Sequence, residues 1–415
     1  MAAKKRKNSK VTFFLFLGVV LLGGYFLLTG NDPLGLFEGV EDMDIPSVTV
    51  SLTEGVEGVQ NNPSPVEADP TTAPAPIVET ATKSDWWEVY FVDYVNHNDP
   101  DDYEDTIAAE IIKKIDEAQS SIHIASFEFD LTPVAEALIR AHDRGVDVRW
   151  VTDDEHGIEA DEDPGGGQFE MLEDEGIEIK DDQRGALMHN KFWIFDRKIV
   201  WTGSTNITES GIFKQDNNVI VIHSEALAEI YEREFDEMWN GEFGIRSTST
   251  ADQQSVIVEG SQLQAFFAAE DDVIDNHIIP IIESAQSSIR FMAFSFTHDG
   301  LEDAMTERFE NGVDVMGIYE KTGSSTVYSE LGDMFCSKMQ VRRDGNGSFL
   351  HHKVIVIDDR IVITGSLNFS DNATESNDEN ILIVDNAEIA ALYIQEVNRV
   401  WDMAADPEPE KFPCE

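Results

Sequence analysis

Two stretches of nearly the same sequence decide the fold. The first reads HNKFWIFDRKIVWTGSTN over residues 189–206, and the second reads HHKVIVIDDRIVITGSLN over residues 351–368. In each stretch two apolar runs flank a polar turn, which predicts two β-strands joined as a hairpin. The same polar residues recur at the same spacing, so the chain contains an internal repeat.

The repeat extends beyond these hairpins. AQSSIHIASFEF begins at Ala118 and AQSSIRFMAFSF begins at Ala285, which is an offset of 167 residues. The hairpins are offset by 162 residues. A longer loop between Thr152 and Met188 in the first copy absorbs the difference. We therefore expect two copies of one folding unit, joined near residues 244–254.

Each copy carries the same order of strand and helix signals. A strand and a helix ending at AQSS come first, and a β-rich run follows. An amphipathic helix then ends at Gly145 or Gly312, and a long helix closes the copy. This alternation predicts an α/β sandwich in each copy. The predicted strands and closing helices are 87–92, 122–129, 146–151 and 227–239, then 263–268, 289–296, 313–318 and 389–401.

The N-terminus predicts export of the rest of the chain. Residues 11–29 contain no charge, and as a helix they cover about 28 Å, close to a bilayer core. We predict a basic cytoplasmic tail over residues 1–10 and a transmembrane signal anchor over residues 11–30, with the body on the extracytoplasmic side of the cell membrane. A cleaved signal peptide, which would make the protein secreted, is the alternative.

An acidic linker is expected between the anchor and the repeat. Residues 31–85 are rich in Pro and Thr and carry eleven acids against one lysine, which is typical of a disordered tether. The two predicted domains follow it and cover residues 86–250 and 251–415.

The charge of the chain restricts its partners. The 415 residues include 81 acids and 29 Lys or Arg, a net charge of −52. Such a body disfavours nucleic acid, because phosphate contacts need clustered Lys and Arg. Adaptation to high salt would also explain this composition and would weaken the repulsion. The two cysteines, Cys336 and Cys414, exclude a disulfide scaffold and leave one bridge possible.

The repeated hairpins carry polar residues suited to a phosphodiester. Lysine supplies charge, Ser and Asn supply neutral donors, and a histidine can act as nucleophile, acid or base. Two copies supply the two histidines that a double displacement at phosphorus requires. The motif is His-x-Lys-x4-Asp-x6-Gly-Ser-x-Asn, with His189, Lys191, Asp196, Gly203, Ser204 and Asn206 in the first copy and His351, Lys353, Asp358, Gly365, Ser366 and Asn368 in the second.

This duplicated motif resembles the signature of the phospholipase D superfamily. The resemblance covers residues 86–404 and implies two α/β/α sandwich domains packed about a pseudo-twofold axis, with one active site between them. From their chemistry we expect both lysines, both serines and both asparagines to contact the substrate phosphate. The resemblance implies that no metal or other cofactor is required. The motif residues Asp196, Asp358, Gly203 and Gly365 would then be structural.

The two histidines differ in their expected support. Glu379 follows His351 by 28 residues, whereas the matching residue after His189 is Asn217. The resemblance implies that a carboxylate near this position orients a catalytic histidine, and a carboxylate stabilises the charge on an imidazole that attacks. We predict that His189 is the nucleophile and that Glu379 reaches it from the other half. The alternative is that Glu379 supports His351 in its own half.

Two substrates remain open. The first hypothesis is a phospholipase D-type phosphodiesterase that hydrolyses phospholipids or transfers their headgroup, acting as a monomer beside its own membrane. The alternative is an anchored or secreted nuclease of the same superfamily. A binding module without activity is disfavoured because both motifs are intact. A cardiolipin synthase is disfavoured because the Asp-x-Arg-Ser segment usual in that family is absent.

Two further signals have plain structural interpretations. We expect His352 to pack in the core, because it faces away from the motif histidine and lysine on the strand. The acidic stretches NHNDPDDYED and DDEHGIEADED lack the spacing of a calcium loop and are expected to be solvated loops.

Overall fold

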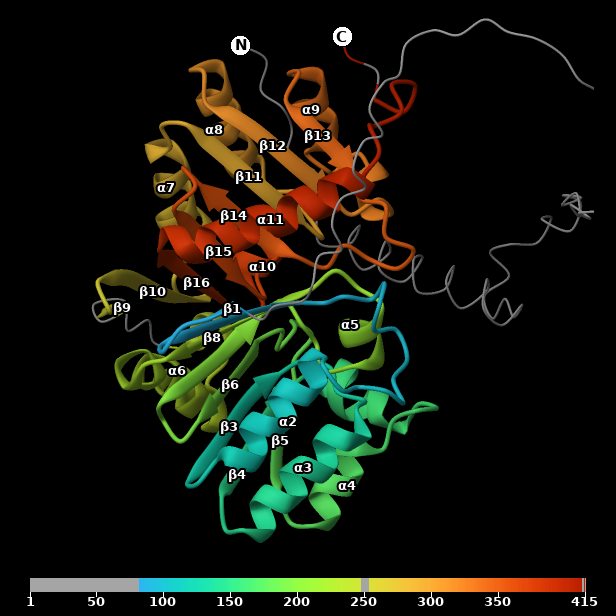
Figure 1. The fold of residues 1–415 in the computed structure, drawn as a ribbon, viewed down its shortest axis with the longest axis vertical. Helices are drawn as coiled ribbons and strands as arrows, with labels where there is room; N and C mark the ends of the chain where they lie inside the picture. Colours follow the sequence, from blue (N-terminus) through green and yellow to red (C-terminus); the bar gives the residue numbers. More distant parts are fainter. Residues whose placement is uncertain (1–81, 248–253, 413, 415) are drawn as a thin grey trace, which may run out of the picture. The chain divides into compact units, whose positions relative to one another are not determined.

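The two copies fold into two similar halves, each built on one eight-stranded sheet (Figure 1). The structure, a computed structural model, describes residues 82–247, 254–412 and 414. In sheet order, the strands of the first half are β1 (Thr82–Lys83), β2 (Trp87–Phe91), β8 (Asn218–His223), β7 (Ile199–Gly203), β6 (Lys191–Phe195), β3 (Ser121–Ser126), β4 (Asp147–Thr152) and β5 (Glu178–Asp181).

The second sheet repeats the topology of the first. Its strands pair in the same order and with the same directions: the last three are parallel and the others are antiparallel. In the matching order, these strands are β9 (Ser255–Val258), β10 (Ser261–Ala268), β16 (Glu379–Asp385), β15 (Ile361–Gly365), β14 (Lys353–Ile357), β11 (Ser288–Ala293), β12 (Asp314–Tyr319) and β13 (Gln340–Arg343).

The predicted hairpins are β6–β7 and β14–β15. Each turns at two consecutive residues with positive φ, Asp196 and Arg197 at 53° and 55°, and Asp358 and Asp359 at 52° and 54°. Two residues with φ above zero form the two-residue turn whose twist matches that of the strands, and Asp tolerates this conformation better than most residues do. The aspartate of the motif therefore defines the hairpin.

The helices also repeat. Ser224 caps the N-terminus of α6 and Asn386 caps that of α11, each accepting a backbone N–H. In the first half the helices are α2 (Ile107–Glu117), α3 (Thr132–Asp143), α4 (Gln168–Asp174), α5 (Glu209–Phe213) and α6 (Glu225–Trp239). In the second half they are α7 (Ile279–Ser284), α8 (Asp299–Glu310), α9 (Leu331–Cys336), α10 (Asp371–Glu375) and α11 (Ala387–Met403).

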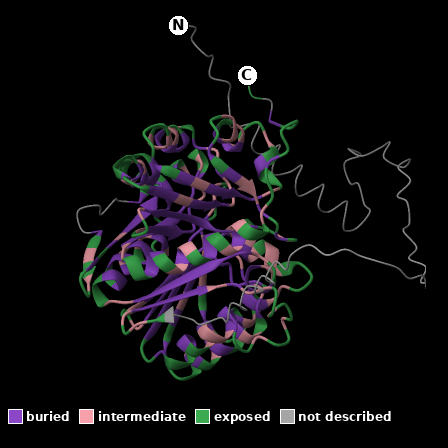
Figure 2. Ribbon diagram, turned by 45° about the horizontal axis from the view of Figure 1, so that its top comes forward, coloured by how far each residue is buried: buried purple, intermediate pink, exposed green. Residues whose placement is uncertain are grey.

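Both faces of each sheet are covered. Helices α2 and α3 lie over β3 and β4, and α11 crosses β14 and β15 (Figure 1). The strands are therefore buried while the helices expose their outer faces (Figure 2). One hydrophobic cluster lies within each half, and a third combines side chains of both halves. In this shared cluster the ring of Phe267 contacts those of Phe192 and Tyr231.

Several boundaries differ from the predictions. Strand β1 lies inside the predicted linker, because Thr82 and Lys83 pair with β2. The strand predicted over residues 122–129 ends at Ser126, where the chain leaves the sheet. The helix predicted to precede the second AQSS is interrupted by a π-helix, η5 (Ile274–Ile278), just before Pro280. Proline lacks the N–H that a regular helix would need at this point.

Two predictions concern the ends of the chain. Cys336 and Cys414 form a disulfide. The predicted anchor over residues 11–30 lies outside the described residues. Within residues 82–247, 254–412 and 414, no helix is long and apolar enough to cross a bilayer.

The glycine of each motif is required by close backbone packing. Gly365 has φ of 158°, and a Cβ there would lie 2.2 Å from the carbonyl oxygen of Asn380. We expect Gly365→Ala to lower the free energy of unfolding by about 1–3 kcal/mol or more, because the backbone must shift or strain. Urea denaturation measures this loss. Gly347→Ala is the matched control, since nothing lies within 4 Å of its Cβ. Equal stability of the two variants would contradict the packing argument.

Candidate active site

Each motif histidine is held by a side chain from the other half. Nδ1 of His189 lies 2.7 Å from Oε2 of Glu379, and Nδ1 of His351 lies 2.8 Å from Oδ1 of Asn217. Glu379 begins β16 and Asn217 directly precedes β8. The structure therefore places Glu379 against His189, not against His351 in its own half. One histidine has a carboxylate behind it and the other has an amide.

Backbone hydrogen bonds fix this exchange. The N–H of His189 donates to the carbonyl of Asp378 at 2.9 Å, and the N–H of His351 donates to that of Asp216 at 2.9 Å. The segment before each hairpin thus forms a short parallel bridge with the opposite half. Main-chain hydrogen bonds between the halves therefore bring the two histidines close together.

Each motif lysine lies between its histidine and a phenylalanine. Nζ of Lys191 donates to the carbonyl of His189 at 2.8 Å and lies 4.9 Å from the ring centre of Phe127. The ring of Phe127 also meets that of His189, with centroids 4.7 Å apart. The second half repeats this arrangement: Lys353 lies 4.7 Å from the ring centre of Phe294 and donates to His351. All four cationic or imidazole groups are buried.

The sequence interpretation missed Phe127 and Phe294. Both follow the end of a parallel strand, β3 or β11, and both stand at the same place in the repeated sequences ASFEF and MAFSF. Their conserved spacing between the two copies was the available signal. This signal was missed because a phenylalanine in a β-rich run is also typical of a core strand.

Burial and mutual repulsion shift the pKa values in this cluster. Burial, and then the charges of Lys191 and Lys353, hold the pKa of both histidines well below the usual range. Burial lowers the pKa of Lys191 to about 8, although Glu379 and Glu128 act in the opposite direction. Burial raises the pKa of Glu379 to about 7, against the influence of Lys191. The imidazoles are therefore neutral near pH 7.

The motif aspartates lie outside the reaction centre. Asp196 accepts backbone N–H groups of Gln119, Ser120 and Ser121, and Asp358 accepts those of Gln286, Ser287 and Ser288. Burial opposes their ionisation, but these hydrogen bonds outweigh it and lower both pKa values. Each aspartate ties its hairpin turn to the start of the neighbouring strand.

The motif serines make bonds within the protein and not toward an open site. The hydroxyl of Ser204 donates to Oδ1 of Asn217 at 2.8 Å and accepts the N–H of Asn218 at 3.1 Å. Ser366 accepts the N–H of Asn380 at 2.9 Å and hydrogen-bonds Glu379. Both serines are fully buried, and their hydroxyls position the residues that hold the histidines. Their predicted contact with the substrate phosphate stays a prediction.

Each motif asparagine has a side-chain oxygen that accepts no hydrogen bond from the described residues. Nδ2 of Asn206 donates to Oε2 of Glu128 at 2.6 Å. The Oδ1 atoms of Asn206 and Asn368 are buried and have no hydrogen-bond partner in the described part of the chain. Buried polar atoms of this kind need an explanation, and a bound substrate would supply one.

His352 packs in the shared core, as expected. Its Nε2 lies 3.0 Å from Oε1 of Glu396 and its Nδ1 lies 2.9 Å from Nδ2 of Asn218. The side chain is fully buried and faces away from the two lysines.

The acidic loop after β4 is more ordered than the sequence suggested. Asp153, Asp154 and Asp182 bring carboxylate oxygens within 4.8 Å of one another, the one group of potential metal ligands of this size among the described residues. Asp153 accepts the N–H of Met188, and Asp182 pairs with Arg184. These bonds give the cluster a structural role beside His189.

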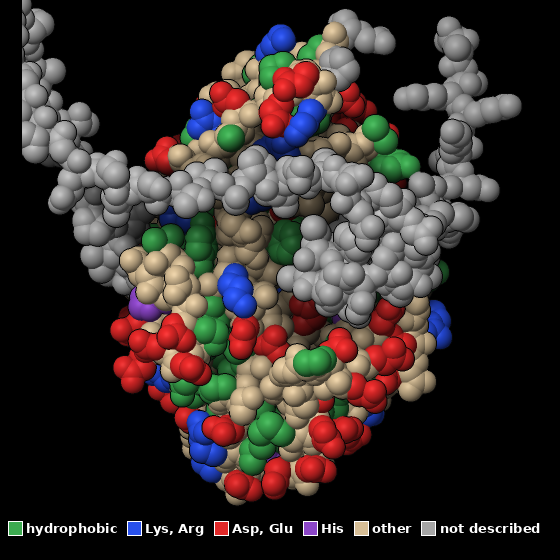
Figure 3. All heavy atoms as spheres, turned by 90° about the vertical axis from the view of Figure 1, so that its right-hand side faces the viewer, with side chains coloured by type: hydrophobic (Ala, Val, Ile, Leu, Met, Phe, Trp, Pro, Cys, Tyr) green, Lys and Arg blue, Asp and Glu red, His purple; other side chains and the backbone are tan. Residues whose placement is uncertain are grey.

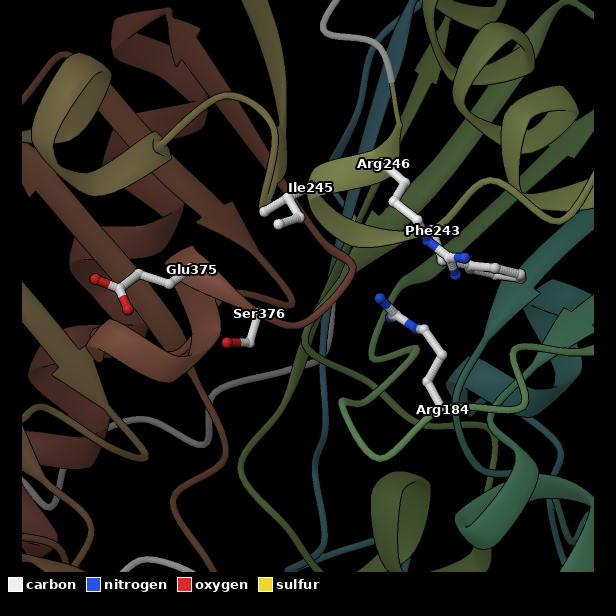
Figure 4. Close-up of a pocket in the computed structure, with 6 residues that line it drawn as sticks. All are labelled: Arg184, Phe243, Ile245, Arg246, Glu375 and Ser376. Atoms are coloured by element: carbon white, nitrogen blue, oxygen red, sulfur yellow. The ribbon is translucent and has the colours of Figure 1, made fainter. Parts of the chain in front are cut away.

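A pocket of about 350 Å³ is lined by Arg184, Phe243, Ile245, Arg246, Glu375 and Ser376 (Figure 4). Its lining comes from both halves, and the guanidinium groups of Arg184 and Arg246 point toward one another beside Phe243 (Figure 4). Arg184 also pairs with the buried carboxylate of Asp378, whose other oxygen accepts the N–H of Gly244. The pocket wall thus supports the residue that precedes Glu379.

Comparisons with known proteins agree with the duplicated fold. A family model described as "Cardiolipin synthase, PLD-like domain" matches residues 111–239 and 278–401, one segment in each half. The phosphatidylserine synthase of Haemophilus influenzae Rd KW20 superposes with a TM-score of 0.60 at 14% identity and covers 76% of this chain and 86% of its own. At that identity the likeness concerns the fold alone.

Curated relatives match one part of the chain. The mitochondrial cardiolipin hydrolase of Xenopus tropicalis is 33% identical over 126 residues, which is 30% of this chain and 60% of that protein. A phospholipase D of Rickettsia bellii is 32% identical over 114 residues, which is 28% of this chain and 57% of that protein. The chain thus spans somewhat over half the length of these relatives. Since the family model covers more than half of the chain, the protein belongs to the phospholipase D superfamily, as a member with two PLD-like domains.

Proposed function

We propose that the protein is a phospholipase D-type phosphodiesterase, which hydrolyses phospholipids or transfers their headgroup through a phosphohistidine intermediate. One observation carries this proposal: two buried histidines converge between two lysines, and a carboxylate backs only one of them. A double displacement needs two histidines with different tasks, and this difference in support separates the tasks.

In the first half-reaction His189 is the nucleophile. Its Nε2 attacks phosphorus while Nδ1 faces Glu379, which stabilises the positive charge that develops on the ring. A phosphorus–nitrogen bond forms and the bond from phosphorus to the headgroup oxygen breaks. His351 donates its proton to that oxygen, and Lys191 and Lys353 bind the phosphoryl oxygens.

In the second half-reaction His351 is the base. It removes a proton from water or from an acceptor alcohol, whose oxygen attacks phosphorus and displaces His189. Both histidines then return to their starting states. None of these steps uses a metal ion, so we expect turnover to persist in EDTA.

Substrate binding prepares the acid for its task. His351 has a depressed pKa because of its burial and because Lys353 and Lys191 lie close to it. A phosphodiester adds a negative charge beside these lysines and favours the protonated imidazole. The anionic substrate would therefore raise the pKa of the histidine that must protonate the leaving alcohol.

A phospholipid fits the surface better than a polynucleotide. Acidic side chains spread over much of the face in Figure 3, with few Lys and Arg among them. An extended polyanion would meet repulsion along such a face, whereas a single diester would bind at the two site lysines and would cross little of that face. Relatives named mitochondrial cardiolipin hydrolase and phospholipase D support the same choice.

We also propose that the body acts outside the cytoplasm, as a monomer on its own membrane. The predicted anchor over residues 11–30 and the acidic linker over residues 31–85 would hold the domains of residues 86–250 and 251–415 near a lipid surface. The disulfide between Cys336 and Cys414 supports an oxidising compartment, since such bonds are rare in the cytosol.

The substrate assignment is tested with the full chain in detergent micelles. We expect release of headgroup from labelled phospholipids and no cleavage of single-stranded DNA, because only the lipid avoids repulsion by the acidic surface. Both substrates are assayed at low salt and at high salt. Cleavage of DNA without headgroup release would identify a nuclease and contradict the proposal.

We expect replacement of the two histidines to have different effects on catalysis. His189→Asn should abolish both turnover and the phosphorylated intermediate. His351→Asn should slow an ordinary diester roughly 10²–10⁴-fold, the usual contribution of general acid–base catalysis, yet spare attack on a p-nitrophenyl ester, whose leaving group needs no proton. Acid quench and mass spectrometry locate the phosphate. His142→Asn, in α3, is the control, and phosphate on His351 would reverse the roles.

The two partner residues offer a matched pair of variants. Asn217→Asp should raise the pKa of His351, because a carboxylate favours the imidazolium, and Glu379→Gln should lower the pKa of His189 further. NMR titration of labelled histidines measures both changes. Unchanged titration of His351 in Asn217→Asp would show that the partner does not govern its charge.

A further inference from the structure

The two halves of the site differ at one accessible position. The chain leaves β3 through Phe127, Glu128 and Phe129, and it leaves β11 through Phe294, Ser295 and Phe296. Parallel bridges from Phe129 to Ile207 and from Phe296 to Phe369 put both segments in the same register. Glu128 and Ser295 therefore occupy equivalent places, and only the first half places a carboxylate there.

Glu128 faces the phosphate site. Its Oε2 accepts Nδ2 of Asn206 at 2.6 Å, and its charge raises the pKa of both Lys191 and Lys353. The lysines and histidines are buried, whereas Glu128 is partly exposed. It is thus the acidic group of the cluster that a bound molecule can reach directly.

A second acceptor accompanies this carboxylate. Asn206 is 4% exposed, and its Oδ1 has no hydrogen-bond partner among the described residues. The carboxylate and this amide oxygen belong to side chains that are bonded to each other. Neither can bind a phosphodiester, because the free oxygens of a diester accept hydrogen bonds and do not donate them. They suit a cationic group instead.

This pair lies beside the centre formed by the two histidines and the two lysines. His351, the proposed acid, hydrogen-bonds the backbone of Ser204, two residues before Asn206 in the same motif. On the other side, Phe127, which directly precedes Glu128, contacts the ring of His189. Both histidines therefore have a neighbour in the chain segments that carry this pair. A carboxylate beside the two lysines would attract a cationic headgroup and would repel the flanking phosphates of a polynucleotide.

We infer that Glu128 determines which alcohol the enzyme accepts, and that it selects phosphodiesters whose headgroup carries a positive charge. The inference rests on the proposed function and specifies its substrate class. The ammonium of the headgroup meets the carboxylate of Glu128 and Oδ1 of Asn206 while the two lysines bind the phosphate. A hydrogen bond or ion pair to a charged partner of this kind is consistent with a preference of about 10- to 100-fold.

The test compares two headgroups in one assay with the full chain. Phosphatidylethanolamine and phosphatidylglycerol with identical acyl chains are mixed in the same detergent micelles, so the ratio of released headgroups gives the ratio of kcat/KM values. We expect the wild type to favour the ethanolamine lipid at least tenfold. Glu128→Gln and Glu128→Ser should lose that preference, so that the ratio of the two released headgroups falls to about one or below.

A control variant and the wild-type assay distinguish failure of this inference from failure of the proposed function. Glu209→Gln removes an exposed carboxylate of α5 outside the site and should keep the wild-type ratio. A Glu128→Gln ratio equal to that of the wild type overturns the inference, as does an equal loss of turnover on both lipids, which would indicate a merely structural role. If the wild type releases neither headgroup, the proposed function itself fails and the inference fails with it.

Discussion

The site depends on one reciprocal exchange of hydrogen bonds between the halves. The segment before β6 bonds the chain before β16, and the segment before β14 bonds the chain before β8. Through this exchange each motif histidine gains both its backbone partner and its side-chain partner from the opposite half. Either half alone would leave its histidine without that support, and buried polar groups without partners are costly. Duplication within one chain ensures that both partners are always present.

Packing reinforces this exchange. The apolar faces of α6 and α11 and the inner faces of both sheets form one hydrophobic cluster that belongs to neither half alone. Around it lie several buried acids with raised pKa values, because burial disfavours their ionised forms. Glu234 of α6 and Glu270, which follows β10, interact across the two halves, and burial raises the pKa of Glu270 to about 8. These glutamates can lie beside the hydrophobic cluster because their raised pKa values favour the neutral, protonated form.

A symmetric fold carries an asymmetric site. Both hairpins have the same turn, the same tie from aspartate to the neighbouring strand, and the same stacking of lysine on phenylalanine. Two differences between the copies lie in side chains of the site. Glu379 of the second copy stands where the first copy has Asn217, and Glu128 of the first copy stands where the second copy has Ser295. In the proposed mechanism the first difference separates the tasks of the two histidines, and the second gives the headgroup a carboxylate partner. Scaffold geometry can therefore be duplicated while the chemistry diverges.

The sequence by itself determined the duplication, the α/β class, the two hairpins and the motif residues, because these follow from local periodicity and from spacing within one chain. It also indicated the asymmetry between Glu379 and Asn217. It could not show which histidine each of them contacts, because both contacts join residues that are far apart along the chain. The inward bonding of Ser204, the roles of Phe127 and Phe294 and the placement of Glu128 were likewise decided only by the tertiary structure. Side chains at the ends of strands take their partners from whatever the packing of the two sheets brings beside them, and no local pattern records that choice.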